Sequence, residues 1–255
     1  MTRMLPQSLI RLPLAHRGLH DVRAGRIENA MASFQAAVSA GYGIELDIQL
    51  SADGQAMAFH DYKLDRVTGE TGLVREKTAA ELTAIQLTGS DGTIPTFREV
   101  LAVVDGKVPL LVEIKDQDGA FGTDVGPLEQ AVARDLRDYS GECAVMSFNP
   151  HSVAEMQRLL PDIPRGLTTD AFAPGCGPAS QDVLVGLRAI ADFDRVGASF
   201  ISHDCNDLDR GRVGALKARG AGILCWTIRS AEQEAKARLI AENITFEGYL
   251  PRLTA

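Results

Sequence analysis

The fold is decided by the stretch Gly43-Ile-Glu-Leu-Asp-Ile-Gln-Leu-Ser-Ala-Asp-Gly-Gln-Ala-Met-Ala-Phe-His-Asp61. Its first part, Gly43–Gln49, is a short apolar run with several branched side chains, which is typical of a buried strand. Asp53-Gly54 is a strong signal for a hairpin turn. We therefore predict that Gln55–Phe59 forms a short strand that returns alongside the first one.

Two carboxylates lie within the first of these strands. Glu45 and Asp47 are two positions apart, so both side chains point to the same side of the sheet. Glu113 repeats this situation in another apolar run, where an ionised carboxylate is expensive unless it is paired or coordinates a metal. Because hard oxygen ligands suit Mg²⁺ or Ca²⁺, we predict that these three residues hold one divalent cation. A buried salt-bridge network with Arg17 and Lys115 is the alternative, and both descriptions can be partly true.

Two histidines follow strands that are expected to reach the same rim of the sheet. His16-Arg17-Gly18 directly follows a predicted strand, and the returning strand brings His60 level with Asp47. Imidazole titrates near neutral pH and can act as acid or as base, so the pair suits phosphoryl transfer. The guanidinium fork of Arg17 matches the geometry of a phosphate. We predict that both histidines are catalytic and that Arg17 binds phosphate.

Further positions are candidates for substrate contacts. Lys115 lies two residues beyond the carboxylate of its own strand, and on the same face, from which its ammonium group can reach a phosphate oxygen. Glu28-Asn29 precedes a helical run, where Asn29 either caps the helix or contacts substrate. Trp226 ends a predicted strand, where its ring either packs on the carbon backbone of a substrate or belongs to the core. Among the other three histidines, His203 is the one to test first.

Short apolar runs alternate with amphipathic stretches along the chain, which is the pattern of a parallel sheet built from βα units. Strands are predicted at Leu12–Ala15, Gly43–Gln49, Val108–Ile114, Cys143–Ser147, Ile163–Leu167, Ser199–Ser202, Gly222–Thr227 and Thr245–Leu250. Helices are predicted near Ala30–Ala40, Thr96–Val104, Leu128–Tyr139, Pro150–Leu160, Gln181–Ala191, Leu208–Arg219 and Ala231–Glu242. Such an alternation favours a closed barrel over an open doubly wound sheet. Because no linker or repeat divides the sequence, we expect one domain over residues 1–255.

Composition and charge argue against several classes of protein. With 45% apolar and 24% charged residues, the 255-residue chain is expected to bury a sizeable core. The net charge of −8 and the lack of a Lys/Arg run argue against a nucleic-acid partner or an anionic membrane surface. No stretch resembles a signal peptide or a span of about 18 apolar residues, so a cytoplasmic protein without stable membrane insertion is expected. The sequence leaves open whether the protein forms a homo-oligomer.

These motifs together resemble the glycerophosphodiester phosphodiesterase family, whose members are relatives of the barrel phospholipases C and D. The matching stretches run in order over nearly the whole chain: His16-Arg17-Gly18, Glu28-Asn29, Ile44–Asp47, Asp53-Gly54, His60-Asp61, Leu64–Gly69, Glu113–Lys115, Ser147-Phe148 and Trp226-Thr227. The resemblance implies a TIM (β/α)8 barrel with a small insertion, Lys63 to Thr93, after the second strand. It also implies that His16 and His60 act as general base and acid, that Glu45, Asp47 and Glu113 hold the metal, and that Arg17 and Lys115 bind phosphate. The substrate implied is a glycerophosphodiester, which yields an alcohol and sn-glycerol 3-phosphate.

Two stretches depart from the pattern of this family. Ile27–Ala30 lacks the proline and threonine that usually flank the Glu-Asn pair, which affects mainly the start of the following helix. Phe246–Pro251 lacks the Thr-Asp that commonly follows the last strand, so substrate fit at that side of the pocket is left undefined. Separately, the segment Asp170–Ser180 is rich in glycine and proline and is expected to form a lid or a dimer contact.

Three other functions fit parts of the pattern. A lysophospholipase D or an inositol phosphodiesterase on the same barrel should have a more apolar rim, and Tyr62, Leu73, Phe121 and Phe172 are too few to require one. A non-catalytic phosphate-binding barrel leaves the two histidines without a purpose. A metal-dependent aldolase or epimerase on a barrel leaves the His-Arg-Gly and His-Asp pairs without a joint role.

Overall fold

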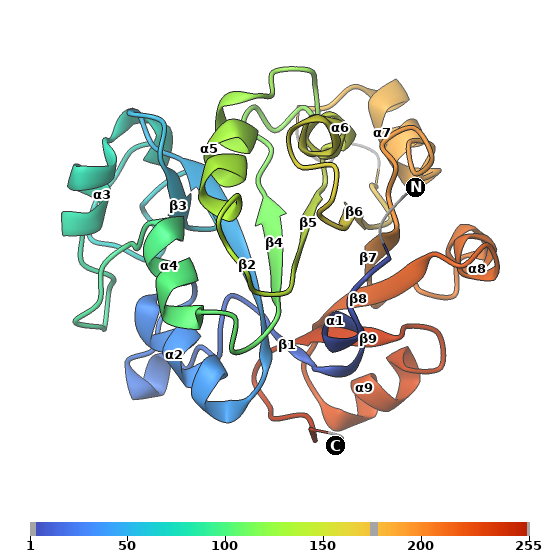
Figure 1. The fold of residues 1–255 in the computed structure, drawn as a ribbon, viewed down its shortest axis with the longest axis horizontal. Helices are drawn as coiled ribbons and strands as arrows, with labels where there is room; N and C mark the ends of the chain where they lie inside the picture. Colours follow the sequence, from blue (N-terminus) through green and yellow to red (C-terminus); the bar gives the residue numbers. More distant parts are fainter. Residues whose placement is uncertain (1–3, 174–177, 254–255) are drawn as a thin grey trace.

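Eight parallel strands close into a barrel surrounded by helices (Figure 1). The computed structural model describes residues 4–173 and 178–253. The strands of the barrel are β1 (Leu14–Ala15), β2 (Gly43–Leu50), β4 (Leu110–Ile114), β5 (Cys143–Ser147), β6 (Arg165–Thr169), β7 (Phe200–Asp204), β8 (Gly222–Ile228) and β9 (Asn243–Phe246). They follow one another in chain order around the barrel, and the parallel pairing of β1 with both β2 and β9 closes it. The prediction of a TIM (β/α)8 barrel is confirmed.

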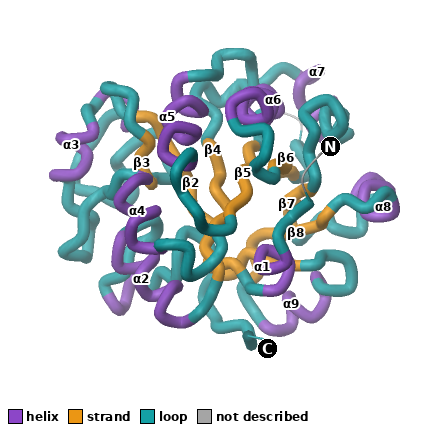
Figure 2. The backbone as a smooth tube through the Cα atoms, viewed as in Figure 1, coloured by secondary structure: helices purple, strands orange, loops and turns teal. Residues whose placement is uncertain are grey.

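Most of the helices lie on the outside of the strands (Figure 2), whereas α1 (Gln7–Arg11) packs Leu9 against the interior of the barrel. The other helices are α2 (Met31–Ala40), α3 (Ala79–Ala84), α4 (Phe97–Val104), α5 (Pro127–Leu136), α6 (Pro150–Leu159), α7 (Gln181–Arg188), α8 (Gly211–Ala218) and α9 (Ala231–Ala237), with short 3₁₀ helices η1 (Val22–Ala24) and η2 (Val74–Glu76). The start of α6 is determined by neighbouring residues of the sequence. Asn149 accepts a hydrogen bond from the backbone N–H of His151, and Pro150 occupies the first turn. Within the described ranges, no helix is long and apolar enough to cross a lipid bilayer.

The predicted hairpin after β2 is present. The strand β3 (Ala56–Ala58) runs antiparallel to β2, with Ile48 opposite Ala58. Gly54 has a φ of +76°, a conformation that glycine adopts without strain, and this lets the chain reverse within a few residues. The backbone N–H of Phe59 then donates to the carbonyl of Asp47 over 3.0 Å. The residue after Phe59 therefore lies beside the carboxyl half of β2, as predicted for His60.

The insertion expected after the second barrel strand lies to one side of the barrel, with α3 at its outer edge (Figure 1). It has its own apolar cluster, which joins β3 to the segment that follows and includes Met57, Leu64, Leu82, Leu87 and Ile94. The packing explains why this stretch is ordered although it has little regular secondary structure: its apolar side chains cover the outer side of the β2–β3 hairpin.

The interior of the barrel is apolar toward the amino ends of the strands and charged toward their carboxyl ends. The apolar part contains Leu14, Leu111, Ala144, Met146, Phe200 and Leu224, with Leu5 and Leu9 from the segment around α1 packed against them. A side chain at Gly166 of β6 would clash here, because a Cβ would lie 2.4 Å from the ring of Phe200. The inward-facing positions nearer the carboxyl ends of β2 and β4 are acidic, and this places the site at that end.

Several predicted boundaries are wrong for local reasons. The first strand starts at Leu14 and not at Leu12, because Leu12 ends α1 by donating its N–H to the carbonyl of Ser8. The last strand ends at Phe246, because Gly248 follows with a φ of +77° and turns the chain away. The helices α8 and α9 are shorter than predicted. Of the predicted lid or dimer contact at Asp170–Ser180, residues 174–177 lie outside the described residues, and that prediction stays open.

Candidate active site

Three carboxylates meet inside the carboxyl end of the barrel. Asp47 on β2 is directly opposite Glu113 on β4, and Glu45 lies one inward-facing position earlier on β2. One oxygen from each carboxylate lies within 4.8 Å of the others. The residues are only 2%, 2% and 6% exposed in the order Glu45, Asp47 and Glu113, so their charges are not screened by water. The structure thus brings together the three predicted metal ligands.

Two cations contact this cluster. Lys115 Nζ bridges Glu113 Oε1 at 2.6 Å and Asp47 Oδ1 at 3.2 Å. Arg17 Nε lies 3.4 Å from Asp47 Oδ2, and the backbone N–H of Arg17 donates to Glu45 Oε2 over 3.1 Å. The alternative of a buried salt-bridge network is therefore also partly realised. This network has one carboxylate more than it has cations, because three carboxylates are paired with only two positively charged side chains.

The pKa values show where that excess charge falls. Burial raises the pKa of Glu45 well above its usual value, and the neighbouring carboxylates of Asp47 and Glu113 raise it further. Burial also opposes ionisation of Asp47, but Lys115, His60 and Arg17 outweigh it and hold the pKa of Asp47 below its usual range. Glu45 is thus the carboxylate whose negative charge is least compensated by the protein.

The donor set fits a hard divalent cation. All three ligands are carboxylates, which suit Mg²⁺ or Ca²⁺ more than softer ions. A double positive charge beside Glu45 would relieve the repulsion that raises its pKa. The described residues thus fit such an ion, with Arg17 beside them in an ion pair of 3.4 Å between its Nε and Asp47 Oδ2.

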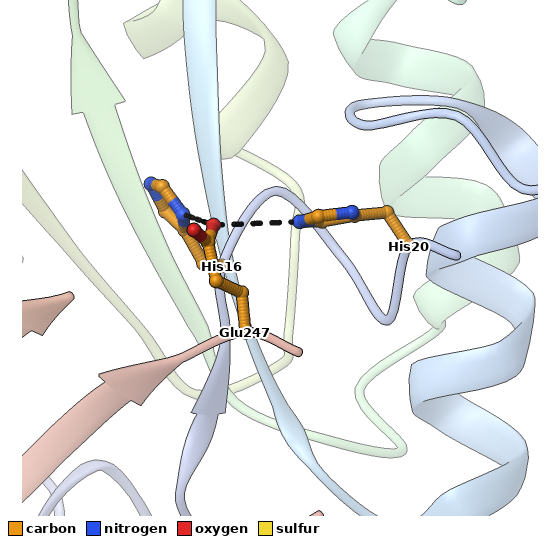
Figure 3. Close-up of side chains that lie close together, drawn as sticks. All are labelled: His16, His20 and Glu247. Atoms are coloured by element: carbon orange, nitrogen blue, oxygen red, sulfur yellow. Dashed lines mark hydrogen bonds and ion pairs between the residues drawn. The ribbon is translucent and has the colours of Figure 1, made fainter. Parts of the chain in front are cut away.

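His16 lies at the edge of this cluster, in the turn that follows β1. Its Nδ1 is 2.6 Å from Glu247 Oε2 (Figure 3). Its Nε2 is 4.0 Å from Glu45 Oε2. Because a carboxylate only accepts hydrogen bonds, Nδ1 carries the proton and Nε2 is the basic nitrogen of the neutral ring. Burial lowers the pKa of His16, against the opposing effect of Glu247.

The turn after β1 explains how His16 and Arg17 both reach the site. Arg17 has a φ of +55° and Gly18 a φ of +79°. Any side chain at Gly18 would collide with Ser33, because a Cβ would lie 2.5 Å from Ser33 Oγ. The glycine of the His-Arg-Gly motif is therefore required by the turn itself. A left-handed arginine is strained, and such strain is concentrated at functional sites.

Glu247 was missed by the sequence analysis. Besides His16, it contacts His20 Nε2 at 3.5 Å through the same oxygen (Figure 3), while its other oxygen accepts from Arg229 Nε at 2.8 Å. The hydrogen bonds from His16 and His20 hold the pKa of Glu247 far below its usual range. Only the observed register shows its place: Phe246 pairs with Ala15, so the residue after the last strand lies beside the residue after the first.

His60 is held in the same manner on the other side of the cluster. Its Nδ1 is 2.6 Å from Asp61 Oδ1. Arg66 in the insertion binds Asp61 Oδ2 through Nε at 2.6 Å and reaches Glu28 Oε1 through Nη2, also at 2.6 Å. Arg66 belongs to the stretch Leu64–Gly69 that matches the family pattern, but no role was predicted for it. Its hydrogen bonds join the insertion to Asp61, the partner of His60, and to Glu28 in the first loop.

The Glu28-Asn29 pair contacts the cluster and not the helix. Glu28 Oε1 accepts from Arg17 Nη1 over 2.6 Å. Asn29 Nδ2 donates to Asp47 Oδ2 over 2.9 Å, and Asn29 Oδ1 accepts from the backbone N–H of Asp47 over 3.2 Å. Ala30 is the N-cap of α2 and provides no side-chain cap, so the capping interpretation of Asn29 is wrong. Both polar atoms of the Asn29 amide are therefore hydrogen-bonded to Asp47 on β2.

Two other predicted positions lie further from the carboxylates. Trp226 Nε1 donates to the carbonyl of Ser202 over 3.0 Å, and its ring packs edge to face against Phe148 with centroids 5.7 Å apart. His203 is fully buried, with Nδ1 2.7 Å from Thr169 Oγ1. The structure therefore places His203 within the barrel wall. Among the remaining histidines, His20 is the one that approaches the site.

A cavity of about 630 Å³ opens beside the cluster on the side of His60. Its lining includes His60, Glu113 and Lys115, so it is continuous with the site. The rest of its wall contains Phe121, Phe148 and Phe172, and we call it the aromatic cavity.

Comparisons with known proteins agree with this geometry. Residues 16–243 match the model of the glycerophosphoryl diester phosphodiesterase family. The Bacillus subtilis protein YhdW is 30% identical over 232 residues, which is 88% of each chain. A glycerophosphodiester phosphodiesterase of Bacillus altitudinis is 32% identical over 165 residues, covering 61% of this chain and 65% of that protein.

Solved structures show the same fold. A phosphodiesterase of Oleispira antarctica, in complex with the product sn-glycerol-3-phosphate, superposes with a TM-score of 0.76 at 24% identity, covering 92% of this chain and 93% of that one. A glycerophosphodiester phosphodiesterase of Thermotoga maritima gives a TM-score of 0.69 at 22% identity, covering 91% and 92%. Together with the family match over most of its length, these findings show that the chain belongs to the glycerophosphoryl diester phosphodiesterase family.

Proposed function

We propose that this protein hydrolyses glycerophosphodiesters to an alcohol and sn-glycerol 3-phosphate, with one divalent cation and two histidines. One observation supports this most: His16 and His60 both lie beside the buried carboxylates, and each is tied through Nδ1 to an acid at 2.6 Å. Each ring therefore keeps Nε2 available for proton transfer. The family match and the product bound to the Oleispira antarctica relative support the choice of substrate.

The charge balance supports the need for a metal. With Arg17 and Lys115 as its cations, the cluster of three carboxylates keeps one negative charge in excess. A phosphodiester, which is itself a monoanion, would be repelled by that excess. A bound divalent cation, held by Glu45, Asp47 and Glu113, would reverse the sign and neutralise charge on the phosphate oxygens. Mg²⁺ and Ca²⁺ both suit these ligands.

The residues of the chain then divide the work of hydrolysis. Arg17 and Lys115 orient the phosphate, since both present donors at the cluster. His16 Nε2 takes the proton from the attacking hydroxyl as its oxygen forms a bond to phosphorus. His60 donates a proton to the alcohol oxygen as the bond from that oxygen to phosphorus breaks. The same pair serves whether water or a neighbouring substrate hydroxyl attacks first, and a trapped cyclic phosphate would identify the second route.

The parts of the site come from both ends of the chain. His16 follows the first barrel strand, and Glu247, which orients it, follows the last. No shorter piece of the barrel contains both residues. We therefore propose that residues 1–255 work as one domain.

The test is the release of sn-glycerol 3-phosphate from purified protein with Mg²⁺, with Ca²⁺ and with EDTA. Glycerophosphocholine, glycerophosphoethanolamine and glycerophosphoglycerol serve as substrates, and the product is measured with glycerol-3-phosphate dehydrogenase. We expect turnover with at least one of the two cations and loss of turnover in EDTA that is restored by adding the cation back. Undiminished turnover in EDTA would contradict the metal site, and no turnover of any diester would contradict the function.

A further inference from the structure

The aromatic cavity has a wall of perpendicular rings. The centroid of Phe172 lies 6.1 Å from those of both Phe121 and Phe148, with interplanar angles of 83° and 87°. Phe172 is in turn packed against Leu184 and Leu187 of α7, which supports it from behind. Rings at right angles to one another form the corner of a box and offer both ring faces and ring edges to an occupant.

The cavity is also negatively charged. Four carboxylates line it, Asp61, Glu113, Asp116 and Asp170, whereas its lysines are Lys63 and Lys115. Asp61 is paired with Arg66, and Glu113 with Lys115. Among residues 4–173 and 178–253, no Lys, Arg or His side chain forms an ion pair with Asp116 or Asp170, whose hydrogen bonds come from Asn149 and from backbone N–H groups. Two carboxylates therefore face this side of the site without a positive partner.

Both of these carboxylates are fixed in place by neutral donors. Asp116 accepts from Asn149 Nδ2 over 2.8 Å and from the backbone N–H of Phe121 over 3.1 Å. Asp170 accepts from the backbone N–H of Phe172 over 2.5 Å. Burial raises the pKa of Asp116 and also that of Asp170. These hydrogen bonds tie each carboxylate to an aromatic residue of the wall, so the charges and the rings form one unit.

We propose that the aromatic cavity receives a quaternary ammonium head group of the substrate, such as the trimethylammonium of a choline ester. This inference rests on the proposed function, because the head group must be the alcohol part of a glycerophosphodiester. A methylated ammonium ion is attracted to aromatic faces, has no hydrogen bond to lose, and is neutralised by nearby carboxylates.

Other occupants match the cavity less well. A glycerol or inositol head group would donate to the carboxylates of the lining, but its other hydroxyls would face phenyl rings, which offer no comparable hydrogen bond. An acyl chain suits the rings, but it would bury Asp116 and Asp170 against hydrocarbon without any compensation. Of the candidate groups, only a soft, bulky cation uses both features of the wall.

The position of the cavity also assigns the ends of the substrate. His60 lines the aromatic cavity, whereas His16 lies across the carboxylate cluster beside Glu247. Attacking and leaving oxygens lie roughly in line on opposite sides of phosphorus. The head group in the cavity is thus the leaving alcohol, and His60 is the residue that protonates it. His16 takes the proton from the attacking hydroxyl group.

The test compares two substrates of the same shape. Glycerophosphocholine carries a trimethylammonium group, and its 3,3-dimethylbutyl analogue carries a neutral tert-butyl group in its place. We expect kcat/KM with saturating cation to be about tenfold or more higher for the choline ester. Equal values would overturn the inference while leaving the proposed hydrolysis intact. If neither of these two is hydrolysed while glycerophosphoethanolamine or glycerophosphoglycerol is, the inference fails and the proposed hydrolysis stands. If no diester is hydrolysed, the proposed function itself fails.

Variants then test whether the cavity causes this preference. The quantity compared is the ratio of kcat/KM for the choline ester to kcat/KM for its neutral analogue, because a general loss of activity lowers both values equally. Asp170→Asn and Phe148→Leu should each bring this ratio several-fold closer to one. Asp124→Asn makes the same charge change on an exposed residue of the loop after β4 and should keep the wild-type ratio. A wild-type ratio in both cavity variants would overturn the assignment.

Lysophosphatidylcholine and lysophosphatidylglycerol complete the comparison. If both 1-acyl diesters are better substrates than glycerophosphocholine regardless of head group, the cavity holds an acyl chain and the inference is wrong. A higher kcat/KM for the choline ester than for the glycerol ester, both with and without the acyl chain, supports the inference.

Discussion

At the scale of single residues, the arrangement of acids behind the two imidazoles has the clearest consequence. Glu247 and Asp61 each accept from an Nδ1 at 2.6 Å, one on either side of the cluster. Such a partner fixes the tautomer and the orientation of the ring, and it stabilises the imidazolium that forms when Nε2 takes a proton.

Glu247 should therefore act as a positioning residue for His16. We expect Glu247→Ala to lower kcat by about 10- to 100-fold with a smaller change in KM. The kcat of Glu247→Gln should lie between those of Glu247→Ala and the wild type. Its amide oxygen still accepts from Nδ1–H but carries no negative charge. Steady-state kinetics measure both, with Glu232→Gln on the exposed face of α9 as the matched control. A wild-type kcat in Glu247→Ala would show that the contact is not used.

His203 predicts a pH effect on stability that is separate from catalysis. Burial lowers the pKa of His203, and the opposing Asp207 does not compensate. Below the ordinary value of 6.5, the unfolded chain thus binds a proton that the folded chain does not, so stability is lost as pH falls. We expect the melting temperature of His203→Gln to decline less steeply than that of the wild type below about pH 6.5. His151→Gln makes the same substitution on α6, and a parallel decline in all three proteins would contradict the prediction.

At the scale of elements, one side chain of the insertion links it to two loops of the candidate active site. Arg66 binds Asp61 and Glu28, which belong to the loops after β3 and β1. Its planar fork makes bonds to two carboxylates that an ammonium group cannot reproduce.

Arg66→Lys should loosen Asp61 and with it His60, although the charge is kept. We expect kcat/KM to fall about tenfold, with little change in melting temperature because Arg66 is half exposed. Arg75→Lys, on η2 of the same insertion, is the matched control. If Arg66→Lys and Arg75→Lys behave alike, the fork of Arg66 does not organise the site.

The elements also show what the sequence can and cannot predict. The β2–β3 hairpin was predictable because the turn signal and both strands are contiguous, and strand spacing alone brings Glu45 and Asp47 to one face. The contact of Asn29 with Asp47 was not, because capping a helix and binding a neighbouring strand require the same residue type. The end of β9 was missed because its apolar pattern continues past the turn at Gly248.

At the scale of the whole molecule, the carboxylate cluster should lower the free energy of unfolding, because its negative charges repel one another when no metal is bound. Glu45, Asp47 and Glu113 are held together by the closure of the barrel, with fewer cations than anions around them. Sequence spacing could suggest the three residues, but only the register of β2 with β4 brings them within reach of one ion.

A divalent cation should therefore stabilise the fold. The melting temperature of the wild type should rise on adding Mg²⁺ or Ca²⁺ in EDTA-treated protein, since a ligand at 100 times its Kd adds about 2.7 kcal/mol. Glu45→Gln keeps the acceptor for Arg17 N–H but removes a charge, so without metal its melting temperature should equal or exceed that of the wild type. The gain from metal should be reduced in this variant. An unchanged gain, in comparison with Glu232→Gln, would place the ion elsewhere.

The central claim is that His16 and His60 act together on one phosphodiester, and the kcat of the two alanine variants tests it most directly. With saturating cation and glycerophosphocholine, His16→Ala and His60→Ala should each lose about 10²- to 10⁴-fold in kcat. The double variant should be about as slow as the slower single one, because groups that act in one step are not additive. His151→Ala is the control. Near wild-type kcat in either single variant would contradict the account.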